Sequence, residues 1–286
     1  MNITQKVKCA VPSKGRLSEP AIGLLHRAGY EFRTKGRNLY ATCTTADIVF
    51  IFVRADDIPV LVASGAVDLG ITGSDLVKER GVSVAEIMGL GFGKCRLCVA
   101  VKEDFTGSDL SALEGANVAT SFPKLTAEFF ASRNVRVNCL EMKGSVEIMV
   151  DLNLAAAIAD IVETGDSLRD NGLKIFAEIG SYETVLIANE GVRESPEVQR
   201  IQRRIQGILI ADRYSLLEYN IPADKLREAE KIAPGFNSPT VSRLDKDGWC
   251  SVKVMVEKAE VIGVMDKLAA IGAAAIIETS AANCRL

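Results

Sequence analysis

Residues 47–81, DIVFIFVRADDIPVLVASGAVDLGITGSDLVKERG, decide the fold class. The apolar run DIVFIFV leads into the helix-like IPVLVASGA, and a second apolar run, DLGIT, leads into SDLVKERG. Strand-like runs that alternate with helix-like segments are typical of βαβ units and of mainly parallel sheets. Ligands of such sheets bind beyond the carboxyl ends of the strands. The polar residues that directly follow a strand are therefore the candidate site residues.

The same alternation continues on both sides of this stretch. VKCAV precedes EPAIGLLHRAG, and CRLCVAV, ANVATS and VNCLEM are further strand-like runs. The stretch 195–219, SPEVQRIQRRIQGILIADRYSLLEY, is predicted to be one long helix that begins at Pro196. A turn-rich segment follows, and then WCSVKVMVE, VIGVMDKLAAIG and AAAIIETS indicate a β-α-β arrangement. We expect a separate small α+β domain from about residue 213.

Composition narrows the class of protein. The chain has 286 residues, of which 48% are hydrophobic, and a net charge of −3. The mixed charge argues against a nucleic-acid-binding protein. No apolar run reaches the roughly 18 residues of a membrane span, and the N-terminus lacks the apolar stretch of a signal peptide. Seven cysteines, an odd number, suit a reducing compartment. We expect a cytoplasmic protein with no membrane partner.

Cys95 and Cys98 form a single CxxC motif. The motif has two interpretations, a metal or redox site, or two small apolar residues in the strand CRLCVAV. Structural zinc needs four ligands, no second CxxC follows, and His26 is the only histidine. We therefore favour the packed strand. A mechanism that uses a histidine base is not expected.

Two loops that follow strands carry cations. In PSKGR, residues 12–16, Lys14 and Arg16 flank Gly15 at the start of a helix, which suits a phosphate or pyrophosphate. A solvated basic turn is the alternative. In VRADDIP, residues 53–59, Arg54 is a candidate anion ligand, and Asp57 is predicted to cap the helix that Pro59 opens.

Two further loops follow strand-like runs. GITGSDL, residues 70–76, places Asp75 in the first turn of a helix, as part of a cap or of a ligand site. GLGFGKCR, residues 89–96, resembles a dinucleotide fingerprint only superficially, because a strand and not a helix follows. It fits better as a flexible crossing between two lobes, with Lys94 and Arg96 at the cleft.

The stretch AIADIVETGDSL, residues 157–168, is the most informative loop. A buried strand ends in ETGDS, whose small residues offer backbone N–H groups and hydroxyls to a phosphate. Asp160 and Glu163 stand just before them, and a carboxylate would repel a bare phosphate. The pattern therefore suits a phosphorylated sugar, with the acids on sugar hydroxyls or on Mg²⁺. An ordinary acidic turn remains the alternative.

This loop resembles the phosphoribosyl-pyrophosphate loop of phosphoribosyltransferases. Together with VPSKGRLSEPA, LGFGKCRL, VATSFPKLT, KGSVE and the tail from KIAPGFNSPTVSRL onward, it is similar to the long form of the ATP phosphoribosyltransferase family. The resemblance implies two α/β lobes like a periplasmic binding protein and a ferredoxin-like (ACT-like) third domain. Lobe I is expected over residues 1–94 with a return segment 182–212, lobe II over 95–181, and the regulatory domain over 213–286.

The resemblance also implies a reaction. N1 of ATP displaces pyrophosphate from C1 of phosphoribosyl pyrophosphate with Mg²⁺, in the first step of histidine biosynthesis. Histidine is expected as a feedback inhibitor, and the chain as a homo-oligomer between dimer and hexamer. Two rival classes stay open: a two-lobed protein that only binds a small molecule, and a prephenate-dehydratase-like enzyme.

Roles follow from the resemblance, residue by residue. Asp160 and Glu163 are expected to face the ribose, and Asp75 is a further substrate-binding residue. Glu147 is expected to accept the adenine amino proton or to help hold Mg²⁺; the metal ligands are left open. Position 156 is alanine where the family commonly has aspartate, so Asp160 is expected to hold more of the sugar. The residues expected to hold the 5-phosphate are Thr164, Gly165, Asp166, Ser167 and Leu168. The cations expected for the triphosphate and pyrophosphate are Lys14, Arg16, Arg54 and Lys94.

The third domain is expected to bind histidine. The ligand carries an ammonium, a carboxylate and an imidazole, so it needs an acidic partner and several donors. Glu218, near the end of the predicted long helix, is the candidate acid. Ser238, Thr240 and the amide of Ala273 are the candidate donors.

Overall fold

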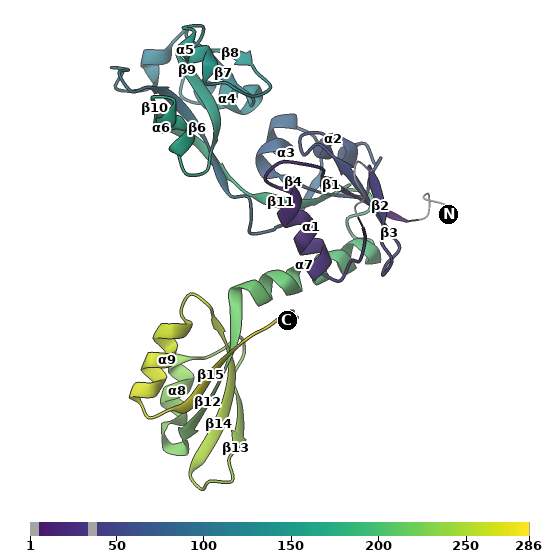
Figure 1. Cartoon of the computed structure of the whole chain (residues 1–286), viewed down its shortest axis with the longest axis vertical. Helices are drawn as coiled ribbons and strands as arrows, with labels where there is room; N and C mark the ends of the chain where they lie inside the picture. Colours follow the sequence, from purple (N-terminus) through teal and green to yellow (C-terminus); the bar gives the residue numbers. More distant parts are fainter. Residues whose placement is uncertain (1–5, 34–38, 286) are drawn as a thin grey trace. The chain divides into compact units, whose positions relative to one another are not determined.

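Three sheets organise the chain in the computed structural model, which describes residues 6–33 and 39–285 (Figure 1). The chain divides into two units close to Gln199, with Arg27–Gly29 grouped with the C-terminal unit. The first unit holds two sheets and the second unit holds one.

Lobe I is built on a six-stranded sheet with the order β2-β3-β1-β4-β11-β5. The parallel neighbours β3, β1 and β4 come from the apolar runs of the sequence, and their side chains form a largely buried core. β11 runs antiparallel to both β4 and β5, so the chain returns to this sheet after it has left it. The strands are β1 (Val7–Pro12), β2 (Tyr40–Thr42), β3 (Ile48–Val53), β4 (Leu69–Gly73), β5 (Ala85–Gly89) and β11 (Thr184–Ala188), and the helices are α1 (Ser18–Arg27), α2 (Ile58–Ala63) and α3 (Ser74–Arg80).

Lobe II is built on a five-stranded sheet with the order β10-β6-β9-β7-β8. β6 is antiparallel to β9 and β10, and β7 is parallel to β8 and β9. Its strands are β6 (Cys95–Lys102), β7 (Asn117–Thr120), β8 (Asn138–Glu141), β9 (Ala157–Val162) and β10 (Leu173–Tyr182), and its helices are η2 (Leu110–Leu113), α4 (Pro123–Ala131), α5 (Ile148–Asp151) and α6 (Asp166–Asp170).

Two chain crossings join the lobes. The first connects β5 to β6, and the second connects β10 directly to β11. The crossings lie side by side, because Leu90 N donates to Thr184 O at 2.8 Å and Thr184 N donates to Phe92 O at 3.1 Å. Gly93 has φ +63°, and a Cβ at this position would collide with the Thr184 hydroxyl. A glycine is therefore required where the two crossings touch. The prediction that GLGFGKCR crosses between lobes is confirmed.

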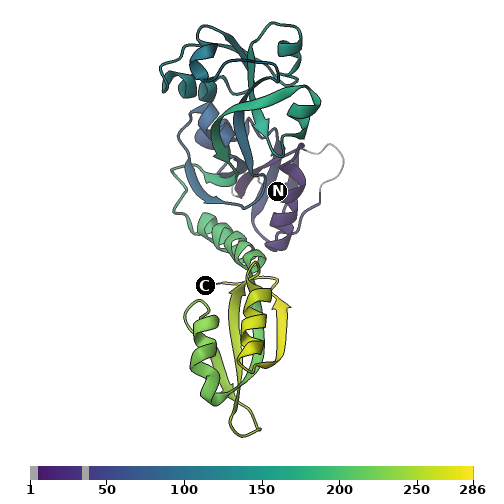
Figure 2. The ribbon, with the colours of Figure 1, turned by 90° about the vertical axis from the view of Figure 1, so that its left-hand side faces the viewer.

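The C-terminal unit contains a four-stranded antiparallel sheet with the order β13-β14-β12-β15 (Figure 2). Two helices pack on one face of it, around the buried side chains of Leu217, Tyr219, Val252 and Leu268. This β-α-β-β-α-β arrangement is ferredoxin-like. Its elements are β12 (Tyr214–Pro222), η3 (Ala223–Lys225), α8 (Leu226–Ile232), β13 (Thr240–Arg243), β14 (Trp249–Glu257), α9 (Val261–Ala270) and β15 (Ala274–Ser280), preceded by α7 (Pro196–Arg213).

Part of the C-terminal prediction is wrong. The long helix ends at Arg213, and residues 214–222 form strand β12 instead of the last helical turns. Side chains in β12 alternate between buried and partly exposed, with Ser215 and Leu217 facing the core, which is the period of two that a strand requires. The turn-rich stretch after β12 contains helix α8. The predicted β-α-β unit did not include strands β12 and β13, which the structure adds to it.

The predicted fold class is confirmed: two α/β lobes and a small α+β sheet domain. The division of the chain close to Gln199 falls inside α7. The boundary near residue 213 therefore stays a prediction. In the part of the chain that the structure describes, no helix is long and apolar enough to cross a bilayer.

Candidate active site

A cavity of about 410 Å³ lies beside the loop that joins β9 to α6, here called the β9–α6 loop (residues 163–165). Most of the residues that the sequence analysis chose for a sugar phosphate meet here, although they come from both lobes. The lining residues are Arg16, Glu147, Asp160, Ile161, Val162, Glu163, Thr164, Gly165, Ser167 and Leu168.

The backbone of the β9–α6 loop turns sharply. Gly165 has φ +89° and ψ 1°, a conformation that only glycine adopts without strain. The turn lets α6 begin at Asp166, directly after the strand. An added Cβ at Gly165 would meet only Val162, at 3.9 Å, so the constraint is the backbone angle and not lack of space.

Asp166 differs from the other predicted loop residues. Its exposed carboxylate accepts a hydrogen bond from the Thr164 hydroxyl at 2.6 Å and pairs with Arg169. These two partners, Thr164 first, lower the pKa of Asp166. Asp166 does not line the cavity, and its contacts with Thr164 and Arg169 instead stabilise the loop on the side away from the cavity lining.

Arg16 reaches the cavity from lobe I. Its Nη1 donates to the carbonyl of Gly93 at 3.1 Å and to Glu163 Oε1 at 3.0 Å, and its Nη2 donates to Cys95 Sγ at 3.1 Å. The pair with Glu163 therefore connects the loop after β1 with the loop after β9. A candidate cation and a candidate sugar-binding acid therefore meet at one point.

Two further acids line the same cavity. Asp160 is partly buried on β9, and its pKa is raised, first by burial and then by the nearby charge of Glu147. Glu147 stands at the N-terminus of α5. The two carboxylates therefore repel one another, which makes the site favourable for a cation or for hydroxyl donors.

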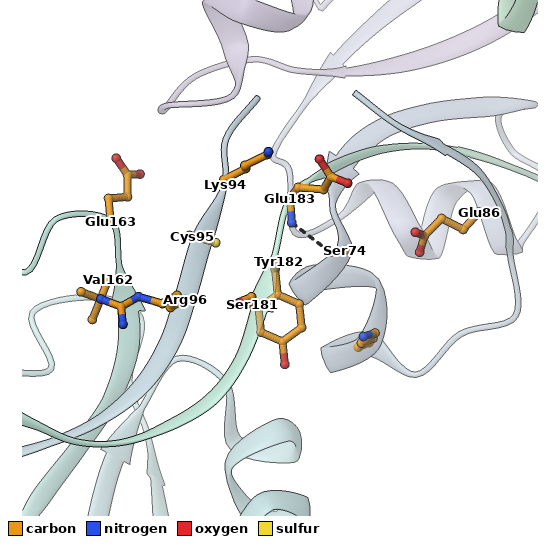
Figure 3. A pocket seen from close by; sticks show the side chains of 11 residues that line it. Ser74, Glu86, Lys94, Cys95, Arg96, Val162, Glu163, Ser181, Tyr182 and Glu183 are labelled. Carbon is orange, nitrogen blue, oxygen red and sulfur yellow. Dashed lines mark hydrogen bonds between the residues drawn. The ribbon is translucent and has the colours of Figure 1, made fainter. Parts of the chain in front are cut away.

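A second cavity, of about 560 Å³, lies against the two crossings (Figure 3). Lys94, Cys95 and Arg96 follow one another at the start of β6, with Tyr182 on the neighbouring crossing. Glu163 lines this cavity as well as the first, so the two are adjacent. Lys94 and Arg96, which are predicted to lie at the cleft, both line this cavity.

Three predicted residues do not line the candidate cavity. Arg54 lines a third cavity, of about 490 Å³, and its Nε donates to Asp56 at 3.1 Å. Lys14 is exposed and lines none of these three cavities. Asp75 is buried at the first turn of α3, and its pKa is raised by burial, although Arg16 acts in the opposite direction.

Asp57 is the N-cap of α2, but its side chain makes no capping hydrogen bond, so that prediction is wrong.

The predicted histidine-site residues are only partly brought together. Glu218 lies in the middle of β12 and not on a helix, and it pairs with Lys253 of β14 at 2.5 Å. Thr240 of β13 is the opposite neighbour of Lys253, so these three side chains form one row across the sheet. Ser238 is exposed in the loop before β13. The amide of Ala273 donates to Leu268 O at 3.0 Å, so it is already used inside the turn after α9.

A reciprocal pair of helix caps, which is not among the predicted features, also joins the lobes. The carboxylate of Glu79, on α3, accepts from the backbone N–H groups of Lys124 and Leu125 at 2.9 Å each, at the start of α4. Lys124 Nζ donates to the carbonyl of Lys78 at 3.3 Å, near the end of α3. No spacing rule signals this contact, because the partners are 45 and 46 residues apart.

Comparison with known proteins identifies the family. The family model described as ATP phosphoribosyltransferase matches residues 54–207, and the model described as HisG, C-terminal domain, matches residues 211–283. An ATP phosphoribosyltransferase of Rhodopirellula baltica is 48% identical over 280 residues, which cover 98% of this chain and 94% of that protein. One of Corynebacterium glutamicum strain R is 39% identical over 281 residues, 98% of this chain and all of that protein.

Solved structures agree. A structure of the ATP phosphoribosyl transferase (HisG:HisZ) complex from Thermotoga maritima has a TM-score of 0.65 and 27% identity, and covers 72% of this chain and 98% of that one. A structure of Tv2483 bound to L-arginine, with a TM-score of 0.50 and 13% identity over 71% of this chain and 85% of that one, shares the two-lobed fold alone. The chain therefore belongs to the ATP phosphoribosyltransferase family, transferases of the first step of histidine biosynthesis.

Proposed function

We propose that this chain transfers the phosphoribosyl group of phosphoribosyl pyrophosphate to N1 of ATP and releases pyrophosphate, in the cavity beside the β9–α6 loop. One observation carries the proposal: Arg16 of lobe I meets Glu163 of lobe II at the rim of a cavity that the loop itself lines. A phosphate, a ribose and a leaving pyrophosphate need a small-residue loop, an acid and a cation, and all three are present.

The loop is proposed to bind the 5-phosphate. Thr164, Gly165, Ser167 and Leu168 line the cavity, and backbone N–H groups of such turns bind anions. Asp166 is proposed to act indirectly, because its carboxylate holds Thr164 and Arg169. Asp160 and Glu163 are proposed to accept hydrogen bonds from the ribose hydroxyls.

The reaction is a substitution at C1 of the ribose. N1 of the adenine supplies the electron pair of the new N1–C1 bond, and pyrophosphate leaves with the electron pair of the broken C1–O bond. Negative charge therefore grows on the leaving oxygen, and a cation at that point stabilises the transition state. Arg16 is proposed for this role, with Lys94 of the adjacent cavity as the second cation. The roles of Lys14 and Arg54 rest on the family resemblance alone.

Catalysis of this kind depends mainly on positioning and charge. The single histidine, His26, stacks on Phe32 in lobe I, with ring centroids 4.4 Å apart, and does not line the candidate site. Glu147 lines the cavity and is proposed to accept the amino proton of the adenine or to help hold a metal.

Mg²⁺ fits the carboxylates of the cavity. Among residues 6–33 and 39–285, no group of three or more His, Cys, Asp or Glu side chains is arranged to hold a metal. Mg²⁺ in nucleotide enzymes is commonly bound by one or two carboxylates together with substrate phosphates. Asp160 and Glu147 would supply such carboxylates, because the charge of each disfavours ionisation of the other and a cation would relieve this repulsion. When bound with the substrate, the metal would neutralise pyrophosphate charge.

Titration calorimetry tests the substrate assignment. Phosphoribosyl pyrophosphate is expected to bind in the presence of Mg²⁺, and ribose 5-phosphate is expected to bind more weakly, because it lacks the pyrophosphate that Arg16 is proposed to contact. A variant that combines Ser167→Ala with Thr164→Val is expected to bind both ligands more weakly than the parent chain. If neither ligand binds the parent chain, the site assignment is wrong.

Regulation by histidine is proposed for the ferredoxin-like unit, and assembly between dimer and hexamer is proposed for the whole chain. The row Thr240–Lys253–Glu218 supplies an acid, a cation and a hydroxyl on one face of the sheet. Glu218→Gln is expected to weaken inhibition by histidine, whereas Glu257→Gln, on the same sheet, is expected to leave it unchanged. Equal inhibition of the parent and the Glu218 variant would place the inhibitor elsewhere. Sedimentation with and without histidine tests the assembly.

A further inference from the structure

We propose that Cys95 is a positioning residue that holds the guanidinium of Arg16 at the candidate site, an inference that rests on the proposed function because Arg16 acts there. Cys95 is the first residue of the CxxC motif and is 5% exposed. In the structure it lies at the start of β6, where the chain crosses from lobe I to lobe II.

Two contacts from one short segment fix Arg16. Nη2 of Arg16 donates to Cys95 Sγ at 3.1 Å, and Nη1 donates to the carbonyl of Gly93 at 3.1 Å. The acceptors are two residues apart on the first crossing, so they hold the two ends of one planar group. An arginine side chain has large rotamer freedom, and a planar group held at both ends loses much of it before the ligand binds. The third contact, to Glu163, comes from the loop that faces the ligand.

A thiol suits this position because it is a neutral acceptor. A carboxylate in its place would neutralise the charge that Arg16 must offer to phosphate. Burial is the largest influence on Cys95 and raises its pKa, although Arg16 acts in the opposite direction. Cys95 therefore stays protonated near neutral pH, and Arg16 is oriented without loss of its positive charge.

Cys98 provides a matched control. Cys98 lies three residues after Cys95 on the same strand, so its side chain points to the opposite face of β6. There it packs against Ala100 and Ile158. Cys95 packs with Leu97 and Tyr182 instead. Both cysteines are buried free thiols. The two cysteines of the motif therefore have different surroundings, although they are only three residues apart.

Kinetics of variants test the proposal. Cys95→Ala is expected to lower kcat/KM for phosphoribosyl pyrophosphate about two- to tenfold, the effect of one hydrogen bond. Cys95→Ser, which keeps an acceptor, is expected to recover most of that loss, and Cys98→Ala is expected to match the parent. In an Arg16→Gln background, Cys95→Ala is expected to have no further effect. The same loss in both backgrounds, or no loss in the parent background, overturns the proposal.

A second measurement does not depend on turnover. The rate of Cys95 alkylation, followed by peptide mass spectrometry across pH, reports the pKa of its thiol. The charges that act on this thiol are Arg16, Asp75 and Glu163. Removal of the cation by Arg16→Gln is expected to raise the apparent pKa of Cys95 and to leave Cys98 unchanged. An unshifted Cys95 profile overturns the contact. If the profile shifts but the parent forms no product, the proposed function fails and the contact stands.

Discussion

Nη1 of Arg16 lies 3.0 Å from Oε1 of Glu163, and the two residues belong to different lobes and are 147 positions apart in the chain. The side chain of Arg16 is 33% exposed and that of Glu163 is 54% exposed. An ion pair this accessible to water contributes little to stability. It can therefore exchange partners, and under the proposed function Arg16 would turn to phosphate and Glu163 to the sugar when the ligand enters.

Arg16→Ala is expected to lower turnover, because the variant would lose the proposed charge-assisted hydrogen bond to a phosphate oxygen. The expected loss of transition-state stabilisation is roughly 1.5–3 kcal/mol. Arg136→Ala is the control, because Arg136 is an exposed arginine that pairs with Glu114 on lobe II. Steady-state kinetics at low and high salt measure both variants. Identical kinetics of Arg16→Ala and the parent would show that Arg16 is only a surface residue.

Gly165→Ala and Gly172→Ala separate backbone strain from ligand binding. Both glycines have positive φ, +89° and +61°, so each alanine is expected to cost about 1–2 kcal/mol of unfolding free energy. Only Gly165 lines the candidate cavity. Denaturant titration is expected to show similar destabilisation, while calorimetry shows weaker phosphoribosyl pyrophosphate binding for Gly165→Ala alone. Equal binding by the two variants would contradict a ligand role for the loop.

Asp160→Asn is expected to make the fold more stable near neutral pH. The pKa of Asp160 is raised in the folded protein, mainly by burial, so its ionisation opposes folding. The carboxyl group contributes fully to the free energy of unfolding below the pKa that it has in the unfolded chain, about 4. This contribution is lost as pH rises through the pKa of the folded protein. The stability of the variant relative to the parent should therefore grow with pH from about pH 4 upward.

Asp166→Asn is the matched control with the opposite sign. The pKa of Asp166 is lowered by Thr164 and Arg169, so its ionised form stabilises the fold above the unfolded pKa. This stabilisation is lost as pH falls through the folded pKa, and the variant should be less stable than the parent at neutral pH. Thermal unfolding across pH measures both variants. If both variants were more stable than the parent at neutral pH, or both less stable, the environments assigned to Asp160 and Asp166 would be refuted.

Glu79→Gln is expected to loosen the contact between the lobes. The variant loses the charge that accepts from two backbone N–H groups of α4, and such cap substitutions cost about 0.5–2 kcal/mol. Glu128→Gln, which removes only a 3.9 Å pair with Lys124 within α4, should cost less than about 0.5 kcal/mol. Thermal unfolding measures stability, and small-angle scattering measures the mean separation of the lobes. An unchanged scattering curve for Glu79→Gln would show that the contact does not hold the lobes together.

Local sequence patterns predicted the parts of the site that are local. The strand before the β9–α6 loop, the glycine at its turn and the acids beside it are contiguous, so their spacing determines their geometry. The run GLGFGKCR directly precedes a strand, and this order predicts Lys94 and Arg96 at the cleft. The contacts from Arg16 to Glu163 and from Glu79 to α4 join distant segments, and no periodicity encodes such partners.

The errors have physical causes. Tyr214–Pro222 follows α7 directly, without an intervening turn, and only the alternation of buried side chains such as Leu217 and Tyr219 distinguishes the strand from the helix. The sequence therefore predicts a helix at Glu218, although this residue lies on a strand beside Lys253. Asp57 has the residue type of a cap, but the backbone there leaves its carboxylate without a capping contact.

The most direct test of the central claim is the formation of the N1-linked product. The parent chain is mixed with ATP, phosphoribosyl pyrophosphate and Mg²⁺, and product absorbance and pyrophosphate are measured together. We expect the two signals to rise in equal amounts, to require both substrates, and to be greatly reduced in a variant that combines Arg16→Ala with Glu163→Gln. Tight binding of phosphoribosyl pyrophosphate without either product, or equal rates in parent and variant, would contradict the account.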